Sequence, residues 1–307
     1  MGTGERRIQV GVQLPEVERE VRWPEYRDMA RAAEDVGYDS LWVGDHLLFR
    51  DPGLAPRGPW EAWSILAALA GITKRIRLGP LVASVSFHNP AMLAKKAATI
   101  DEISGGRLIL GLGAGWNETE YRAFGFPFDH RVQRFEEALT IIRGLLRDGE
   151  VDFAGRYHQA RECLLLPRPA RPGGPPIMIG TMGSRMLRLT ARHADAWNSW
   201  FTWYGNRPAG LAALREKVDA ACVAEGRDPA TLERTAAVLV QLEDRAVPRR
   251  GGLEVPAPPI RGTSQEIADQ VRALATAGIS HVQLVVDPIT VRSIERLAPV
   301  VDALHSR

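Results

Sequence analysis

The sequence predicts a single (β/α)8 barrel, a TIM barrel, with insertions in the loops at the C-terminal face of its strands. Segments with the period of a strand alternate with segments with the period of a helix along almost the whole chain, which is typical of a parallel sheet. The 307 residues contain no linker and no break in composition. One barrel domain over 1–307 therefore explains the length better than two domains, and an open doubly wound sheet is the alternative.

Each predicted strand is followed by a predicted helix. After the first strand, Pro24 begins a helix that Gly37 ends, and Pro90 begins another that the Gly105-Gly106 pair ends, as these residues commonly do. The predicted strands are 8–14, 40–43, 75–83, 107–112, 176–180, 196–199, 235–242 and 281–286, and the predicted helices are 23–36, 60–72, 90–104, 132–146, 185–192, 210–225, 264–277 and a last one at the C-terminal end.

Two segments depart from this alternation. Residues 151–166 are predicted to form a small β-hairpin around Ala154-Gly155. Residues 244–259 are rich in Pro, Gly and Arg and have no apolar period, which predicts a long mobile loop. In a barrel this loop follows the seventh strand on the face where active sites form, so it is either a lid or an idle surface loop.

Composition excludes several classes of protein. The net charge is +2 and the basic residues are spread out, so we expect no nucleic-acid partner. Two cysteines are too few for a disulfide framework. No run approaches eighteen apolar residues and the N-terminus lacks an apolar signal core, so we expect a cytoplasmic protein with no membrane partner.

The strand at 40–43 ends in a candidate for proton transfer. Gly44 turns the backbone, and Asp45 and His46 follow where a parallel strand delivers side chains to a cleft. A neutral imidazole takes or gives a proton near pH 7, and the adjacent carboxylate could fix its tautomer. Taken alone, such a pair is more often a turn cap beside a satisfied core histidine.

Two glycine-containing turns could contact a ligand. Gly111, Gly113 and Gly115 alternate at the end of the fourth predicted strand, where backbone could approach a ligand closely, or where the chain forms a tight packing corner. Residues 180–184 lie between a strand and a helix, and N–H groups at a helix N-terminus bind phosphate well. The hydroxyls of Thr181 and Ser184 would add donors, although plain capping by Ser184 is an equal alternative.

Other side chains suggest a pocket but no metal. Trp197, Trp200, Phe201, Trp203 and Tyr204 follow the sixth strand, and some of these rings are expected to line the mouth of a large apolar pocket. The histidines are scattered without metal-binding spacing, so no metal site is expected. The series Arg131, Arg134, Glu136, Glu137 is most simply a solvated helix face.

Taken together, these segments resemble the luciferase-like monooxygenase superfamily over essentially the whole chain. The resemblance rests on S-L-W-V-G-D-H-L at 40–47, R-I-R-L-G-P-L-V at 75–82, the long segment at 93–120, P-P-I-M-I-G-T-M-G-S-R at 175–185, H-A-D-A-W-N at 193–198 and G-T-S-Q-E-I-A-D-Q-V at 262–271. The pattern is most similar to the branch that uses the deazaflavin coenzyme F420 in place of FMN.

The resemblance implies a barrel with a tricyclic ring lying across the strand ends. It implies a non-proline cis peptide behind the ring at about Leu81-Val82, and a catalytic role for His46. It also implies that the 180–184 loop suits the cofactor phosphate. The cofactor-binding residues that it implies are Leu81, Val82, Ala83, Gly113, Ala114, Gly115, Asn117, Gly180, Thr181, Met182, Gly183, Ser184, Trp197 and Asn198.

The chain departs from the sugar-phosphate dehydrogenases of that branch at two positions. Arg50 stands where those enzymes have an aromatic residue, four positions after the histidine, and Trp116 stands where they have a carboxylate, although Glu118 lies two residues on. We therefore do not expect sugar-phosphate oxidation, and we expect a more apolar substrate pocket.

The hypothesis is an F420-dependent oxidoreductase that transfers a hydride between deazaflavin C5 and a small, largely apolar organic substrate. His46 would exchange the accompanying proton and Asp45 would orient it. The alternatives are an FMN-dependent luciferase-like monooxygenase and, in another class, a non-catalytic flavin- or deazaflavin-binding protein. Because members of the family often pair through barrel helices, a homodimer is also expected.

Overall fold

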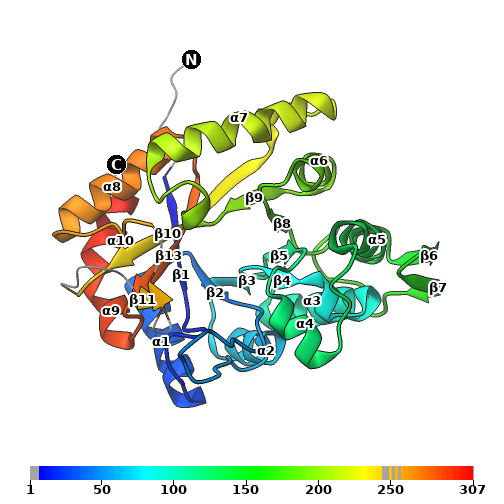
Figure 1. Ribbon diagram of the computed structural model, residues 1–307, viewed down its shortest axis with the longest axis horizontal. Coiled ribbons are helices and arrows are strands. Elements are labelled where there is room, and N and C mark those ends of the chain that lie inside the picture. The colour runs from blue at the N-terminus through cyan, green and yellow to red at the C-terminus, as the bar shows by residue number, and fades with distance from the viewer. Residues whose placement is uncertain (1–6, 244–248, 251–252, 255–256, 307) are drawn as a thin grey trace.

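The structure is a computed structural model that describes residues 7–243, 249–250, 253–254 and 257–306. Its centre is a parallel sheet curved into a barrel, with helices around it (Figure 1). The order across this sheet is β3 (Arg77–Pro80), β2 (Ser40–Val43), β1 (Gln9–Gln13), β13 (His281–Asp287), β10 (Glu233–Gln241), β9 (Ala196–Ser199), β8 (Ile177–Gly180), β5 (Leu110–Gly113) and β4 (Ala83–Ser84).

The sheet closes where β3 meets the chain that enters β5. The predicted strand 75–83 is present as two pieces, β3 and β4, and a parallel bridge joins Leu78 to Leu108. With β3 and β4 counted as one strand, the described residues contain the expected eight barrel strands, and the predicted TIM barrel is confirmed. Strands such as β13 are buried along their whole length, because the barrel interior covers one face and the helices cover the other.

The helices of the described chain mostly begin and end where the sequence predicts. Gly37, with φ of 96°, ends the first helix in the left-handed conformation that glycine tolerates best. The second helix starts later than expected, at Ala62, because the Glu61 carboxylate caps it by accepting the N–H groups of Trp63 and Ser64. The helices are α1 (Trp23–Val36), α2 (Ala62–Ile72), α3 (Pro90–Ser104), α5 (Arg131–Arg143), α6 (Ser184–His193), α7 (Pro208–Ala224) and α8 (Ser264–Thr276).

Three helical features differ from expectation. A short helix, α4 (Glu118–Phe124), follows β5 and was not predicted. A π-helical turn at Gly144–Asp148 follows α5, which therefore ends earlier than expected. The predicted C-terminal helix is divided into α9 (Val291–Arg296) and α10 (Ala298–His305). A proline lies in the first turn of α10, and because proline has no backbone N–H it cannot donate a helical hydrogen bond to the end of α9.

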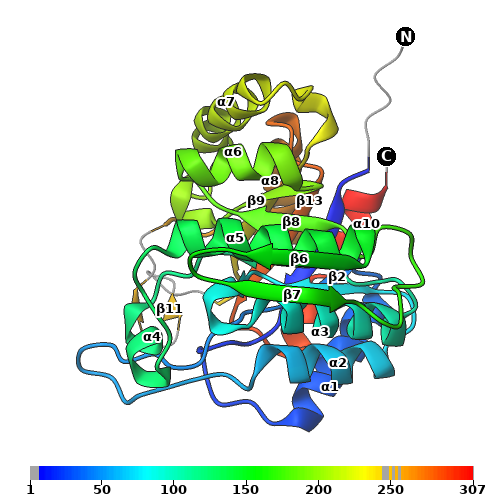
Figure 2. The ribbon, with the colours of Figure 1, turned by 90° about the vertical axis from the view of Figure 1, so that its right-hand side faces the viewer.

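The predicted hairpin is present as β6 (Glu150–Ala154) paired antiparallel with β7 (Gln159–Leu164). It lies beside α5 (Figure 2), where the Glu137 carboxylate accepts the backbone N–H groups of residues 156, 157 and 158. Most of the predicted loop at 244–259 lies outside the described residues. Its described parts show an antiparallel pair of β11 (Arg249–Arg250) with β12 (Leu253–Glu254).

Within the described part of the chain, none of the helices has both the length and the apolar composition needed to cross a bilayer.

Candidate active site

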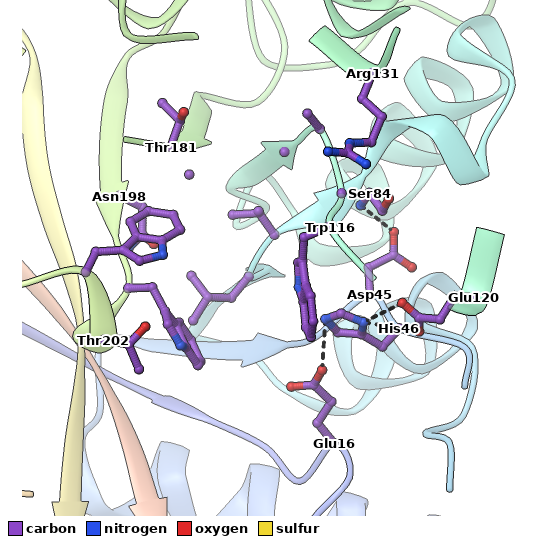
Figure 3. Close-up of a pocket in the computed structure, with 18 of the residues that line it drawn as sticks. Glu16, Asp45, His46, Ser84, Trp116, Glu120, Arg131, Thr181, Asn198 and Thr202 are labelled. Atoms are coloured by element: carbon purple, nitrogen blue, oxygen red, sulfur yellow. Dashed lines mark hydrogen bonds and ion pairs between the residues drawn. The ribbon is translucent and has the colours of Figure 1, made fainter. Parts of the chain in front are cut away.

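A cavity of about 860 Å³ opens at the C-terminal ends of the barrel strands. This volume is within the usual range of small-molecule and cofactor sites. Segments far apart in the sequence line it, including the loops after β1, β2, β5, β8 and β9 (Figure 3). The cavity therefore lies at the strand ends, where the sequence predicts the site.

His46 lies in this cavity between two carboxylates. Its Nδ1 is 2.9 Å from Oε2 of Glu120, and its Nε2 is 3.2 Å from Oε1 of Glu16 (Figure 3). The Phe49 and Trp116 rings lie beside the imidazole, with centroid separations of 4.8 and 5.5 Å. Only 18% of the His46 side chain is exposed, so its polar environment is provided by the protein more than by water.

Glu120 fixes both the ring and the chain that carries it. This buried carboxylate, on α4, also accepts the backbone N–H groups of Leu47 at 2.6 Å and Leu48 at 3.0 Å. Glu118, the carboxylate noted from the sequence near this position, is exposed instead. Two positions along a helix turn a side chain to a different face, so recognising α4 as a helix could have separated the two residues.

Glu16 comes from the loop after β1 and was not predicted as a site residue. Its Oε2 accepts a hydrogen bond of 3.0 Å from Nε2 of Gln13, at the end of β1. A Cβ at Gly44 would lie 2.6 Å from Cδ of Glu16, so glycine at position 44 makes room for this carboxylate. A carboxylate just past a predicted strand end was the available signal, of the same kind that identified His46.

The two carboxylates determine the protonation of His46. Burial lowers the pKa of the imidazole, but the charge of Glu16, the hydrogen bond and charge of Glu120, and the charge of Asp45 outweigh it. The net effect raises the pKa above its usual value, so the protonated imidazolium is favoured.

Asp45 does not orient His46, and that prediction is wrong. Its Oδ2 instead accepts the backbone N–H of Ser84 and bonds Nε2 of His88, each at 2.9 Å. Successive residues of an extended segment point to opposite sides, so neighbours in the sequence do not readily share a hydrogen bond. Asp45 lines the cavity and ties the end of β2 to β4, while Glu120 orients the imidazole.

The peptide bond between Leu81 and Val82 is cis, as expected. Both residues line the cavity, and the methyl groups of Val82 fill the space in front of three glycines. A Cβ would lie 3.1, 2.7 and 3.2 Å from these methyl carbons at Gly111, Gly113 and Gly180, respectively. Gly111 and Gly113 therefore pack closely against Val82, as the packing-corner interpretation expects. Gly113 and Gly180 also face the cavity, and their contact with a ligand stays a prediction.

Most of the residues that the resemblance implies lie together at the cavity. The lining includes Leu81, Val82, Gly113, Ala114, Gly115, Gly180, Thr181, Met182, Gly183 and Asn198, with Asp45 and His46. Their contact with a cofactor remains a prediction.

Four of the implied residues do not line the cavity. Ala83 is fully buried, and Asn117 instead donates a 3.1 Å hydrogen bond from Nδ2 to the Leu48 carbonyl. Ser184 is exposed and is the first residue of α6, whose N-cap is Gly183, so capping by Ser184 is not observed. Trp197 is buried and donates from Nε1 to the Thr181 carbonyl at 2.7 Å, which supports the cavity wall from behind.

Arg131, the first residue of α5, was expected on a solvated helix face but lines the cavity. Its guanidinium lies 3.7 Å from the centroid of the Phe128 ring. In Figure 3, Arg131 and Thr181 lie on the side of the cavity away from Glu16. The N-terminus of α6 also reaches the cavity at Gly183 and has no side-chain cap. An anionic group could bind at this side.

Large apolar side chains are exposed at the cavity. Trp116 is 66% exposed, Met182 53% and Trp203 36%. The expectation for the rings after the sixth strand holds for Trp200, Phe201 and Trp203, whereas Trp197 and Tyr204 do not line the cavity. Exposed apolar groups gathered at one cavity are typical of a binding site. No group of His, Cys, Asp and Glu side chains in the described residues is arranged to hold a metal ion.

The structure also bears on Arg50 and Trp116, the two positions where the chain departs from the sugar-phosphate dehydrogenases. Phe49 supplies an aromatic ring beside His46, and Glu120 supplies a carboxylate. The histidine therefore has both kinds of neighbour, from other positions than Arg50 and Trp116. The exposed apolar side chains, and not these departures, are the observation that favours an apolar substrate.

The chain belongs to the luciferase-like monooxygenase family, whose sequence profile matches residues 8–249. It is 36% identical over 228 residues to a phthiodiolone/phenolphthiodiolone dimycocerosates ketoreductase of Mycobacterium tuberculosis, a match that covers 68% of this chain and 59% of that protein. It is 31% identical over 208 residues to a 5,10-methylenetetrahydromethanopterin reductase of Archaeoglobus fulgidus, covering 68% and 57%. The chain thus spans less than two thirds of the length of these curated relatives.

Solved structures share the fold. An F420-dependent secondary alcohol dehydrogenase in complex with an F420-acetone adduct superimposes with a TM-score of 0.80 at 20% identity, covering 98% of this chain and 100% of that one. The monooxygenase RslO1 from Streptomyces bottropensis gives 0.77 at 21% identity, covering 97% and 98%. The predicted family and barrel fold are confirmed, and the relatives named above are oxidoreductases.

Proposed function

We propose that this protein is an F420-dependent oxidoreductase that moves a hydride between C5 of the deazaflavin and a carbon of a small, largely apolar organic substrate. The observation that carries this proposal is the placement of His46 in a strand-end cavity, held between Glu16 and Glu120. The relatives support it, because one at 36% identity over 174 residues is named as an F420-dependent glucose-6-phosphate dehydrogenase of Amycolatopsis mediterranei, in a match that covers 55% of this chain and 50% of that protein.

The cavity residues fit a flat cofactor with an anionic tail. Leu81 and Val82 form an apolar wall, and Gly113 and Gly180 present backbone without side chains. Arg131 and the uncapped N-terminus of α6 suit a phosphate. When bound, the deazaflavin supplies a carbon that accepts or releases a hydride.

His46 would handle the proton that accompanies the hydride. Glu120 holds Nδ1 in a hydrogen bond, which leaves Nε2 beside Glu16 to exchange a proton with a substrate oxygen or nitrogen. Because the pKa of His46 is raised, the imidazolium is ready to donate this proton when the substrate is reduced. In the opposite direction the same atom accepts it.

Cofactor titration tests the proposal against its nearest alternative. The purified protein is titrated with F420 and with FMN, and binding is followed by quenching of fluorescence. We expect binding of F420, followed by hydride transfer to or from a panel of apolar ketones and alcohols. Tight FMN binding with oxygen uptake and no affinity for F420 would instead indicate an FMN-dependent monooxygenase. Cofactor binding without turnover of any substrate would favour a non-catalytic binder.

A further inference from the structure

The opening of the cavity carries large apolar side chains from three neighbouring strand ends. Trp116 follows β5, Met182 follows β8 and Trp203 follows β9, and these three strands lie side by side in the sheet. Each of the three side chains lines the cavity and is exposed to solvent as well. Together they form one apolar rim, a name that we keep for Trp116, Met182 and Trp203.

The groups around His46 lie deeper than this rim. Glu16 and Glu120 both contact His46, and all three side chains are largely buried. The side chains of the apolar rim, in contrast, are each exposed by 36% or more. From His46 outward, the cavity therefore changes from charged and buried to apolar and exposed.

Trp116 connects the two depths. The centroid of its ring lies 5.5 Å from that of the His46 imidazole and 6.2 Å from that of the Phe49 ring. The same indole also reaches solvent. A molecule that places a reacting group at His46 and extends along Trp116 would therefore leave the cavity over apolar surface.

The apolar rim has two sides. In Figure 3, Thr181 and Thr202 lie across the cavity from Trp116. Met182 and Trp203 are the residues that follow them in the chain. Because the rim side chains line the cavity that contains His46, the occupant they fit is the outer part of a bound substrate, and not a partner protein on an outer face.

We propose that Trp116, Met182 and Trp203 are specificity-determining residues that hold an apolar tail of the substrate. The substrate is then a small organic molecule that has its reacting carbonyl or hydroxyl group near one end, at His46, and an alkyl tail that passes outward along the apolar rim. This inference rests on the proposed function, because it takes His46 as the residue that faces the reacting group.

A series of ketones tests the inference by isothermal titration calorimetry. The protein is saturated with whichever of F420 or FMN it binds, in the oxidised form, so ketones bind without being reduced. The probes are butan-2-one, hexan-2-one, octan-2-one and decan-2-one. Full burial of one methylene corresponds to about 4-fold in affinity, so we expect the affinity to rise about 2- to 4-fold for each added methylene. Decan-5-one has the same composition as decan-2-one but a carbonyl in mid-chain, and it should bind about 3-fold more weakly or worse.

Variants then assign the effect of the tail to residues. Trp203→Ala should lower the ratio of decan-2-one affinity to butan-2-one affinity by about 3- to 10-fold, because the outer methylenes lose their contact. Trp116→Ala should lower the same ratio from the opposite side of the opening. The matched control is Trp23→Ala, which should leave the ratio unchanged: Trp23 begins α1, does not line the cavity and is 37% exposed, against 36% for Trp203.

Several results would overturn the inference. An affinity that does not rise with chain length would show that the apolar rim serves another occupant, such as a partner protein. Equal binding of decan-2-one and decan-5-one would show that the tail has no fixed direction. A ratio that neither Trp116→Ala nor Trp203→Ala lowers, or that Trp23→Ala lowers as much, would remove the assignment to the rim. The ketone series can be measured with either cofactor bound, so the two proposals fail separately.

Discussion

At the residue scale, the proposed chemistry depends on one imidazole whose two nitrogens both face carboxylates. Glu120 holds Nδ1 and Glu16 approaches Nε2, so the ring is held in one orientation and its pKa is raised above the usual value. Proton transfer by a positioned side chain commonly contributes about 10²–10⁴-fold to a rate.

Under the proposed function, His46→Ala should therefore reduce kcat of hydride transfer by about 10²–10⁴-fold, because the proton donor is lost while the apolar cavity wall at Leu81 and Val82 is intact. Steady-state kinetics and a parallel cofactor titration measure the two effects. A variant that binds cofactor normally and turns over at the wild-type rate would remove the catalytic assignment.

The carboxylates that raise the His46 pKa can be removed singly. Burial lowers the pKa of His46, and Glu16 and Glu120 raise it. In Glu120→Gln or Glu16→Gln one of the groups that raise the pKa is lost, so the imidazole should titrate at a lower pH than in the wild type. Titration of the His46 ring resonances by NMR measures this shift. The stabilisation from the charged pair is present at low pH and is lost as the pH rises through the folded-state pKa, so it should also disappear at a lower pH in these variants. An unchanged titration would contradict the assigned cause.

At the scale of elements, short connections after the strands position the site. The turn from β5 to α4 passes Gly115, whose φ is 76°, and a Cβ there would lie 1.8 Å from the Tyr121 hydroxyl oxygen. That hydroxyl bonds the Ala114 carbonyl at 2.9 Å and lies 3.0 Å from Oγ of Ser84. The β5–α4 turn, β4 and α4 are thus held together at one point.

Gly115→Ala should destabilise the protein through both backbone strain and this clash. Gly125, with φ of 77° and no atom within 4 Å of the position that a Cβ would take, provides the matched control for strain alone. Gly125→Ala should cost about 1 kcal/mol of unfolding free energy, and Gly115→Ala about 1–3 kcal/mol more. Urea unfolding measures both, and equal losses would show that the Tyr121 contact has no energetic weight.

At the scale of the whole molecule, the barrel interior contains a histidine that is chemically different from His46. His281, on β13, is buried beside Trp42 with Nε2 2.7 Å from the Ser40 hydroxyl. Burial, and secondarily the charge of Arg77, lowers the pKa of His281 to about 3. The same residue type thus has a raised pKa at the strand ends and a lowered pKa in the interior.

His281 should make the folded barrel sensitive to acid. Its folded-state pKa lies below the unfolded value of about 6.5, so its contribution is fully present above about pH 6.5 and is lost as the pH falls towards 3. His281→Gln should reduce the slope of unfolding free energy against pH by up to about 1.4 kcal/mol per pH unit in this window. Urea unfolding between pH 4 and 7 measures the slope, and an identical slope in the variant would refute this expectation.

The expected homodimer stays a separate prediction, which sedimentation equilibrium would test.

The sequence by itself determined the barrel, most element boundaries, the family and the position of His46 at a strand end, and the resemblance to the family implied the cis bond at Leu81-Val82. These follow from local signals: the period of apolar residues, the prolines and glycines at helix ends, and motifs that are continuous in the chain. The placement of His46 after a strand was sufficient because every parallel strand of a barrel ends at the same face.

Only the tertiary structure decided what surrounds that histidine. Glu120 lies 74 positions from His46 in the chain, and Glu16 reaches it from a different strand end, so no local pattern relates them. Adjacency in the sequence favoured Asp45 as its partner, but neighbours on an extended segment point apart, and Asp45 bonds His88 instead. Hydrogen bonds depend on distances in space, and in a closed barrel the nearest groups come from other strand ends.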